Sequence, residues 1–135
     1  MTLTRLEKLA LCLSGLTAVG IGATITLAPQ TFYASYSIAI AQDPSLLSEL
    51  RAPGAGLTTL GILMLVGIWR SALAQLAVAA TLVVFLAFPT GRFIGLAVDG
   101  LPSPGILAAL ALEIAIAAFC LFAFRRRLIA RAAQP

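Results

Sequence analysis

The sequence predicts an all-α membrane protein, a four-transmembrane-helix bundle whose N and C termini are both cytoplasmic. Hydrophobic residues make up 61% of the 135 residues and charged residues only 10%, whereas in soluble domains about 25% of residues are charged. Four apolar runs are each long enough to cross a bilayer. The basic residues collect at the ends of these runs that share one side of the membrane. The length fits a single domain, residues 1–135.

The first two predicted spans cover residues 9–27 and 46–69. Arg5 and Lys8 precede the first span, and a proline-containing segment follows it. A cleaved signal peptide is the alternative, because basic residues before an apolar stretch are its signature, but no convincing small-residue cleavage site follows. Asp43-Pro44 precedes the second span and is typical of a helix start.

The third and fourth predicted spans cover residues 72–98 and 105–124. The third is long for one straight crossing, and Pro89 is expected to bend it, because proline removes a backbone donor and crowds the preceding turn. A cluster of turn-forming residues, 99–104, separates the two spans. An even number of spans places both termini on the same side.

The distribution of charge sets the predicted orientation. Arg5, Arg70 and the arginine run 125–127 fall on one side of the four spans, whereas Asp43 and Asp99 fall in the opposite loops. Cytoplasmic loops of membrane proteins carry an excess of lysine and arginine. The side that holds both termini is therefore expected to be cytoplasmic.

Small residues recur at helix-packing spacing in the first two spans. Two stripes follow this pattern: Ser14, Ala18 and Gly22, and Gly54, Thr58 and Gly61. Such stripes allow the backbones of neighbouring helices to approach closely in lipid. We expect them to be packing seams within the bundle.

Glu113 is the most informative ionisable residue. It lies about nine residues into the fourth span, hence roughly 13 Å below the outer boundary at 1.5 Å per residue. A carboxylate at that depth costs several kcal/mol unless it is paired, hydrated or protonated. Two interpretations stay open: an acid that binds a proton or a substrate, and an ion pair that fixes the bundle.

Arg51 and Arg92 are the candidate partners of Glu113, because both are expected near the outer boundary on neighbouring helices. Glu49 and Asp99 extend the pair into a predicted binding or structural polar cluster. Arginine matches a carboxylate with two parallel donors, which favours an intramembrane ion pair. Alternatively, the two arginines extend to the lipid headgroups.

Several chemistries are disfavoured. The chain has no histidine, which removes the usual haem ligand, the commonest general base and most zinc sites, and we expect no metal and no cofactor. The two cysteines form no CxxC motif. No basic patch with interleaved aromatic residues indicates nucleic acid as a partner.

Three short motifs follow one another along the chain: Leu50-Arg51-Ala52 followed by two glycines, then Gly91-Arg92, then Asp99-Gly100-Leu101-Pro102. With these motifs the chain resembles a family of small bacterial membrane proteins, catalogued as domain of unknown function number forty-three forty-five. More distantly, the chain is similar to DoxX-like four-helix membrane proteins. The resemblance implies four helices in the bacterial cytoplasmic membrane and a site near Arg51, Arg92, Asp99 and Glu113. It implies no particular activity, because the family has none assigned. The chain departs from the expected pattern at Pro53, where we expect an aromatic residue.

We expect an uncharacterised binding or accessory protein that holds a lipid, a quinone or a protein partner in a polar pocket in the outer half of the bundle. The alternative is a proton-coupled carrier of a small molecule or an ion, centred on Glu113 and working as an oligomer. An enzyme is the least favoured class, because no nucleophile stands at a plausible spacing from a base. The expected partners are membrane lipids and either another protein or further copies of the chain.

Overall fold

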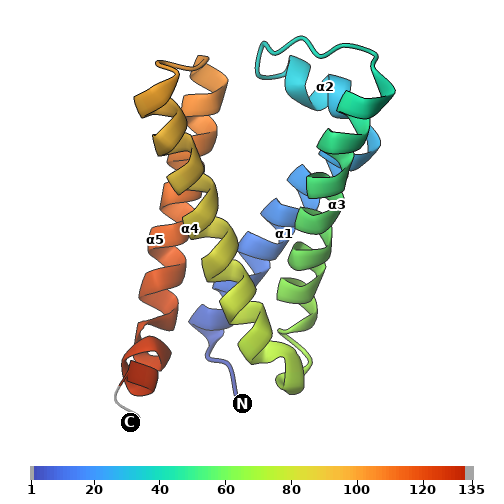
Figure 1. Cartoon of the computed structure of the whole chain (residues 1–135). Helices are drawn as coiled ribbons and strands as arrows, with labels where there is room; N and C mark the ends of the chain where they lie inside the picture. Colours follow the sequence, from blue (N-terminus) through green and yellow to red (C-terminus); the bar gives the residue numbers. More distant parts are fainter. Residues whose placement is uncertain (1, 133–135) are drawn as a thin grey trace.

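The chain is an antiparallel arrangement of long helices in a computed structural model that describes residues 2–132 (Figure 1). Two short helical segments accompany them, and the described range contains no strand. The elements are α1 (Arg5–Leu27), α2 (Pro29–Ala34), α3 (Pro44–Val66), the 3-10 turn η1 (Ser71–Leu73), α4 (Ala74–Val98) and α5 (Pro104–Ala132).

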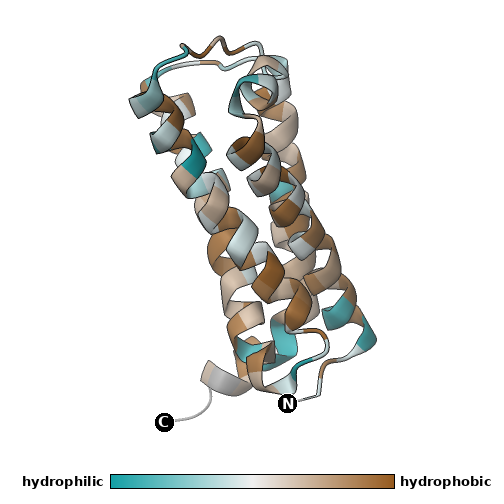
Figure 2. Cartoon of the chain, turned by 90° about the vertical axis from the view of Figure 1, so that its right-hand side faces the viewer, coloured by the Kyte–Doolittle hydropathy of each residue, from teal (hydrophilic) through white to brown (hydrophobic). Residues whose placement is uncertain are grey.

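Three helical segments are long and apolar enough to cross a membrane: Arg5–Leu27, Ser71–Val98 and Pro104–Ala130. Helix α3 is also long, but its first turns carry Glu49 and Arg51. Hydrophobic residues follow the helices along most of the bundle, and hydrophilic residues gather mainly towards its ends (Figure 2). The predicted all-helical fold is confirmed, and its three apolar helices indicate a multi-pass membrane protein.

Helices α1 and α5 extend by four residues or more beyond one of their predicted bounds. Helix α1 begins four residues early because Thr4 and Glu7 form a capping box: the Thr4 hydroxyl accepts from the Glu7 N–H at 3.3 Å, and the Glu7 carboxylate accepts from the Thr4 N–H at 2.7 Å. Helix α5 continues through the arginine run 125–127 to Ala132. Arginine is a good helix former and is favourable near a helix C-terminus, so the end of the apolar run does not end the helix.

The two stripes of small residues, each predicted as a packing seam within the bundle, pack against each other between α1 and α3. These helices share the most extensive helix contact of the bundle. A Cβ atom added at Gly22 would lie 2.6 Å from the Gly54 carbonyl oxygen and from the Thr58 nitrogen. One added at Gly61 would lie 2.7 Å from the nitrogen of Val19. The two backbones are therefore in direct contact, as small residues permit.

The helices form two pairs, α1 with α3 and α4 with α5, which converge at one end and separate at the other (Figure 1). We call the end that holds both termini the terminal end, and the end that holds α2 and residues 99–103 the loop end. Most of the large fully buried side chains, including Leu11, Met64 and Phe124, belong to the terminal half. There Ser14 of α1 also lies 3.4 Å from Thr81 of α4, oxygen to oxygen.

An ion pair that the sequence did not predict closes the terminal end. The Arg127 side chain of α5 donates two hydrogen bonds to the Glu7 carboxylate of α1: Nε donates to Oε1, and Nη2 donates to Oε2 at 3.0 Å. Arg127 Nη2 also donates to the backbone oxygen of Thr2. Glu7 is only 3% exposed. The pair therefore joins the first and last helices at a buried position.

Candidate functional site

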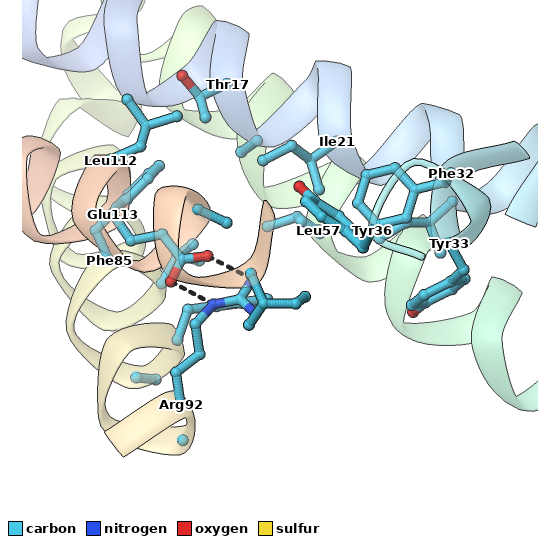
Figure 3. Close-up of a pocket in the computed structure, with 18 residues that line it drawn as sticks. Thr17, Ile21, Phe32, Tyr33, Tyr36, Leu57, Phe85, Arg92, Leu112 and Glu113 are labelled. Atoms are coloured by element: carbon cyan, nitrogen blue, oxygen red, sulfur yellow. Dashed lines mark hydrogen bonds and ion pairs between the residues drawn. The ribbon is translucent and has the colours of Figure 1, made fainter. Parts of the chain in front are cut away.

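Glu113 and Arg92 form an ion pair between α5 and α4 in the loop half (Figure 3). Arg92 Nε donates to one carboxylate oxygen at 2.8 Å, and Nη2 donates to the other at 2.9 Å. The side chain of Glu113 is 8% exposed and that of Arg92 is 26% exposed. Two parallel charge-assisted hydrogen bonds are the strongest arrangement that these groups make. The prediction that Glu113 bonds to an arginine of a neighbouring helix is confirmed, with Arg92 as the partner.

The local sequence places both side chains. Glu113 lies on the buried face of α5, at helical spacing from other buried residues: Leu110, Ile116, Ala117 and Cys120. Arg92 follows the buried Pro89 by three residues, and α4 continues as one helix on both sides of that proline. Pro89 has no N–H to donate to the carbonyl of Phe85, which loosens the hydrogen-bond ladder one turn before Arg92.

The ion pair lies on the wall of a cavity of about 570 Å³ that opens where the two helix pairs separate. All four long helices contribute to its lining, together with the segment around α2. Most of the lining is apolar and includes Ile21, Ile25, Leu57, Val84, Phe85 and Leu112. A mostly apolar cavity with a few polar groups on one wall is the usual form of a small-molecule site.

Aromatic residues cover the loop-end side of this cavity. Phe32 packs edge-on against Tyr33 and Tyr36, with ring centroids 5.2 Å apart in both pairs. The hydroxyl of Ser103 donates to the backbone oxygen of Tyr36 at 2.8 Å. A Cβ added at Gly105 would lie 2.9 Å from the Tyr36 ring, so glycine permits this close approach. The segment after α2 is thus fastened to the start of α5.

The other three predicted cluster residues lie elsewhere. Arg51 donates to the backbone oxygen of Thr26 and, at 3.5 Å, to that of Leu27, and so caps the C-terminus of α1 instead of reaching Glu113. Glu49 is exposed on α3. Asp99 is exposed at the C-cap of α4 and shares a smaller hollow, of about 290 Å³, with Arg92.

The polar cavity residues that the sequence analysis missed are hydroxyl-bearing. Thr17 of α1 lines the cavity, as do Tyr33 and Tyr36. Their position depends on how α2 folds back over the bundle, and no short motif marks that. Within residues 2–132, no three His, Cys, Asp or Glu side chains gather into a possible metal site. The wall instead presents hydroxyl groups and one neutralised ion pair, which suits binding.

Comparison with protein families gives a match over most of the chain. A family model covers residues 6–124, and that family is described as Domain of unknown function (DUF4345). No curated protein and no solved structure matches the chain.

Proposed function

Because the chain belongs to this family, whose description assigns no activity, we propose a function from the geometry of the site. The protein binds a lipid-soluble amphiphile, such as a lipid or a quinone, in the loop-half cavity. The observation that carries this proposal is the Arg92–Glu113 pair on the wall of an otherwise mostly apolar cavity of about 570 Å³. Cavities that hold small ligands have volumes of about 300–1,000 Å³.

The proposal includes a position in the membrane. Helix α3 serves as the fourth span, the terminal end faces the cytoplasm, and the membrane is the bacterial inner membrane. Arg5, Arg70 and the arginine run 125–127 support this orientation, because cytoplasmic ends are rich in basic residues. The cavity then opens in the outer half of the bilayer, where lipid-soluble molecules enter from the side.

Topology reporters test this placement. Fusions at Arg70 and after Arg127 are expected to give a cytoplasmic signal, and fusions near Asp43 and Gly100 an external signal. Alkaline phosphatase and a cytoplasmic fluorescent protein, fused at each site in turn, measure the two states. A cytoplasmic signal from the Asp43 loop would contradict the fourth span.

The alternative function, a proton-coupled carrier, would require a different role of Glu113. A proton-coupled carrier requires this carboxylate to exchange protons during each cycle, whereas both of its oxygens are engaged by Arg92. This engagement supports the binding role. A protein partner or a second copy of the chain remains a prediction, and the cavity supports a small molecule more directly.

Filling the cavity tests the proposed function. Ala109 lines the cavity, and its neighbour Ala108 is exposed and does not. We expect the wild-type protein, purified in mild detergent, to retain a small amphiphile that native mass spectrometry detects. Ala109→Phe should reduce the bound fraction at least about tenfold, because a phenyl ring occupies the space of the ligand.

Ala108→Phe is the matched control, since it adds the same ring one residue away on the exposed side of α5. This variant should retain the amphiphile at the wild-type level. Equal occupancy in both variants would show that the cavity is not the binding site.

A further inference from the structure

The charges of the cavity define the kind of head group that it accepts. Its charged lining residues are Arg92 and Glu113, and these neutralise one another through two hydrogen bonds. The remaining lining is apolar or hydroxyl-bearing. A ligand therefore meets a site with no net charge.

A charged head group would unbalance this pair. An anion would either displace Glu113 from the guanidinium or bind the remaining N–H groups of Arg92 and place a second negative charge beside a carboxylate that is 8% exposed. A cation would compete with Arg92 for the carboxylate. In each case a charge at a buried position is left unbalanced, which is the costly state of a buried ion pair.

The hydrogen-bonding capacity that remains at Arg92 is that of donors alone. The pair uses Nε and one N–H of Nη2, which leaves the second N–H of Nη2 and both N–H groups of Nη1, and a guanidinium never accepts. The Tyr36 side chain extends towards the pair from the opposite wall (Figure 3). Its hydroxyl supplies a further donor that rotates to suit the ligand.

Resting on the proposed function, we infer that the ligand is an uncharged amphiphile with a carbonyl oxygen in its head group, bound at Arg92 and Tyr36. Its hydrocarbon part lies against Ile21, Leu57 and Leu112. Two kinds of membrane molecule supply this chemistry: isoprenoid quinones, and the amides and esters of fatty acids.

A set of probes with one hydrocarbon chain isolates the head group. Radiolabelled oleamide is bound to the purified full-length protein in a scintillation proximity assay and competed with unlabelled oleamide, oleate and oleylamine. At about pH 8.5 the carboxyl of oleate is ionised and the amine of oleylamine is charged. We expect oleate and oleylamine to compete at least about tenfold less well than oleamide, a difference of about 1.4 kcal/mol.

Decylubiquinone separates the two sources. Competition stronger than that of oleamide assigns the quinone class, and weaker competition assigns the fatty amides and esters; either result supports the uncharged carbonyl head group. Tyr36→Phe keeps the ring and removes the donor, and should weaken oleamide binding about threefold to tenfold.

Glu113→Gln provides the sharpest test, because it leaves Arg92 without its negative partner. Oleate should then bind at least about tenfold more tightly than it binds the wild-type protein. Tyr36→Phe, which preserves the pair, should leave the preference against oleate intact. If Glu113→Gln elutes as an aggregate in size-exclusion chromatography, the Tyr36→Phe result and the wild-type series decide the inference.

The failures of the two proposals are distinguishable. If oleate binds the wild-type protein as tightly as oleamide and Ala109→Phe abolishes the binding of both, the cavity binds ligands but the inference about charge is wrong. If Ala109→Phe leaves the binding of all probes unchanged, the proposed function itself is wrong.

Discussion

Arg92→Gln should lower the free energy of unfolding by about 3–5 kcal/mol, because it removes the partner of a buried carboxylate. Glu113 is 8% exposed, so water reaches it poorly once the guanidinium is gone. Glu113→Gln should cost less, about 1–3 kcal/mol, because Arg92 is 26% exposed and its long side chain can turn towards water or headgroups. The predicted asymmetry follows from the unequal burial of the two partners.

The double variant Arg92→Gln/Glu113→Gln should be more stable than the sum of the two single losses predicts, since neither charge is then left alone. Reversible unfolding of the purified protein in mixed micelles of mild and denaturing detergent measures all three variants. Arg51→Gln combined with Glu113→Gln is the control. Arg51 donates to the last turn of α1, so its effect should simply add to that of Glu113→Gln. Additive losses for the Arg92 combination would mean that the pair contributes nothing to stability.

The second large effect is expected at the seam between α1 and α3. Gly22→Ala places a Cβ within 2.6 Å of the Gly54 carbonyl oxygen and of the Thr58 nitrogen. These are backbone atoms, so the clash is relieved only if the two helices move apart. Overpacking of this kind costs about 1–3 kcal/mol.

Gly20 provides a matched control two residues away on the same helix. It is exposed, and an added Cβ would meet nothing within 4 Å. Gly20→Ala should therefore stabilise the protein by about 0.5–1 kcal/mol through the greater helix propensity of alanine. The same unfolding assay should separate the two variants by about 1.5–4 kcal/mol. Equal stability of the two variants would show that α1 and α3 do not touch along this stripe.

The sequence predicted those features that depend on periodicity and depth. The seam followed from the spacing of small residues, because a period of three to four residues fixes one helix face. The burial of Glu113 and its need for a partner followed from its place within an apolar run. The expected range of partners, Arg51 or Arg92, included the one that the structure shows.

The sequence did not distinguish the two arginines. Which of them reaches Glu113 depends on the rotation and tilt of each helix, and packing against neighbours sets these. Arg51 is turned towards the end of α1 and is occupied there. The cavity could not be predicted either, because helix packing also forms it. It arises where the two helix pairs separate and where α2 folds over the space between them.

The pairing of Glu7 with Arg127 has a consequence for biosynthesis. The two residues are 120 positions apart, so at roughly 5–20 residues per second the ribosome makes Arg127 on the order of ten seconds after Glu7. During that interval the capping box with Thr4 is the local partner of the Glu7 carboxylate. Arg92 and Glu113 are only 21 positions apart and are both made within a few seconds. The α1–α3 seam and the α4–α5 ion pair can therefore both form before Arg127 is made, and the first helix is expected to be fastened to the last helix late in assembly.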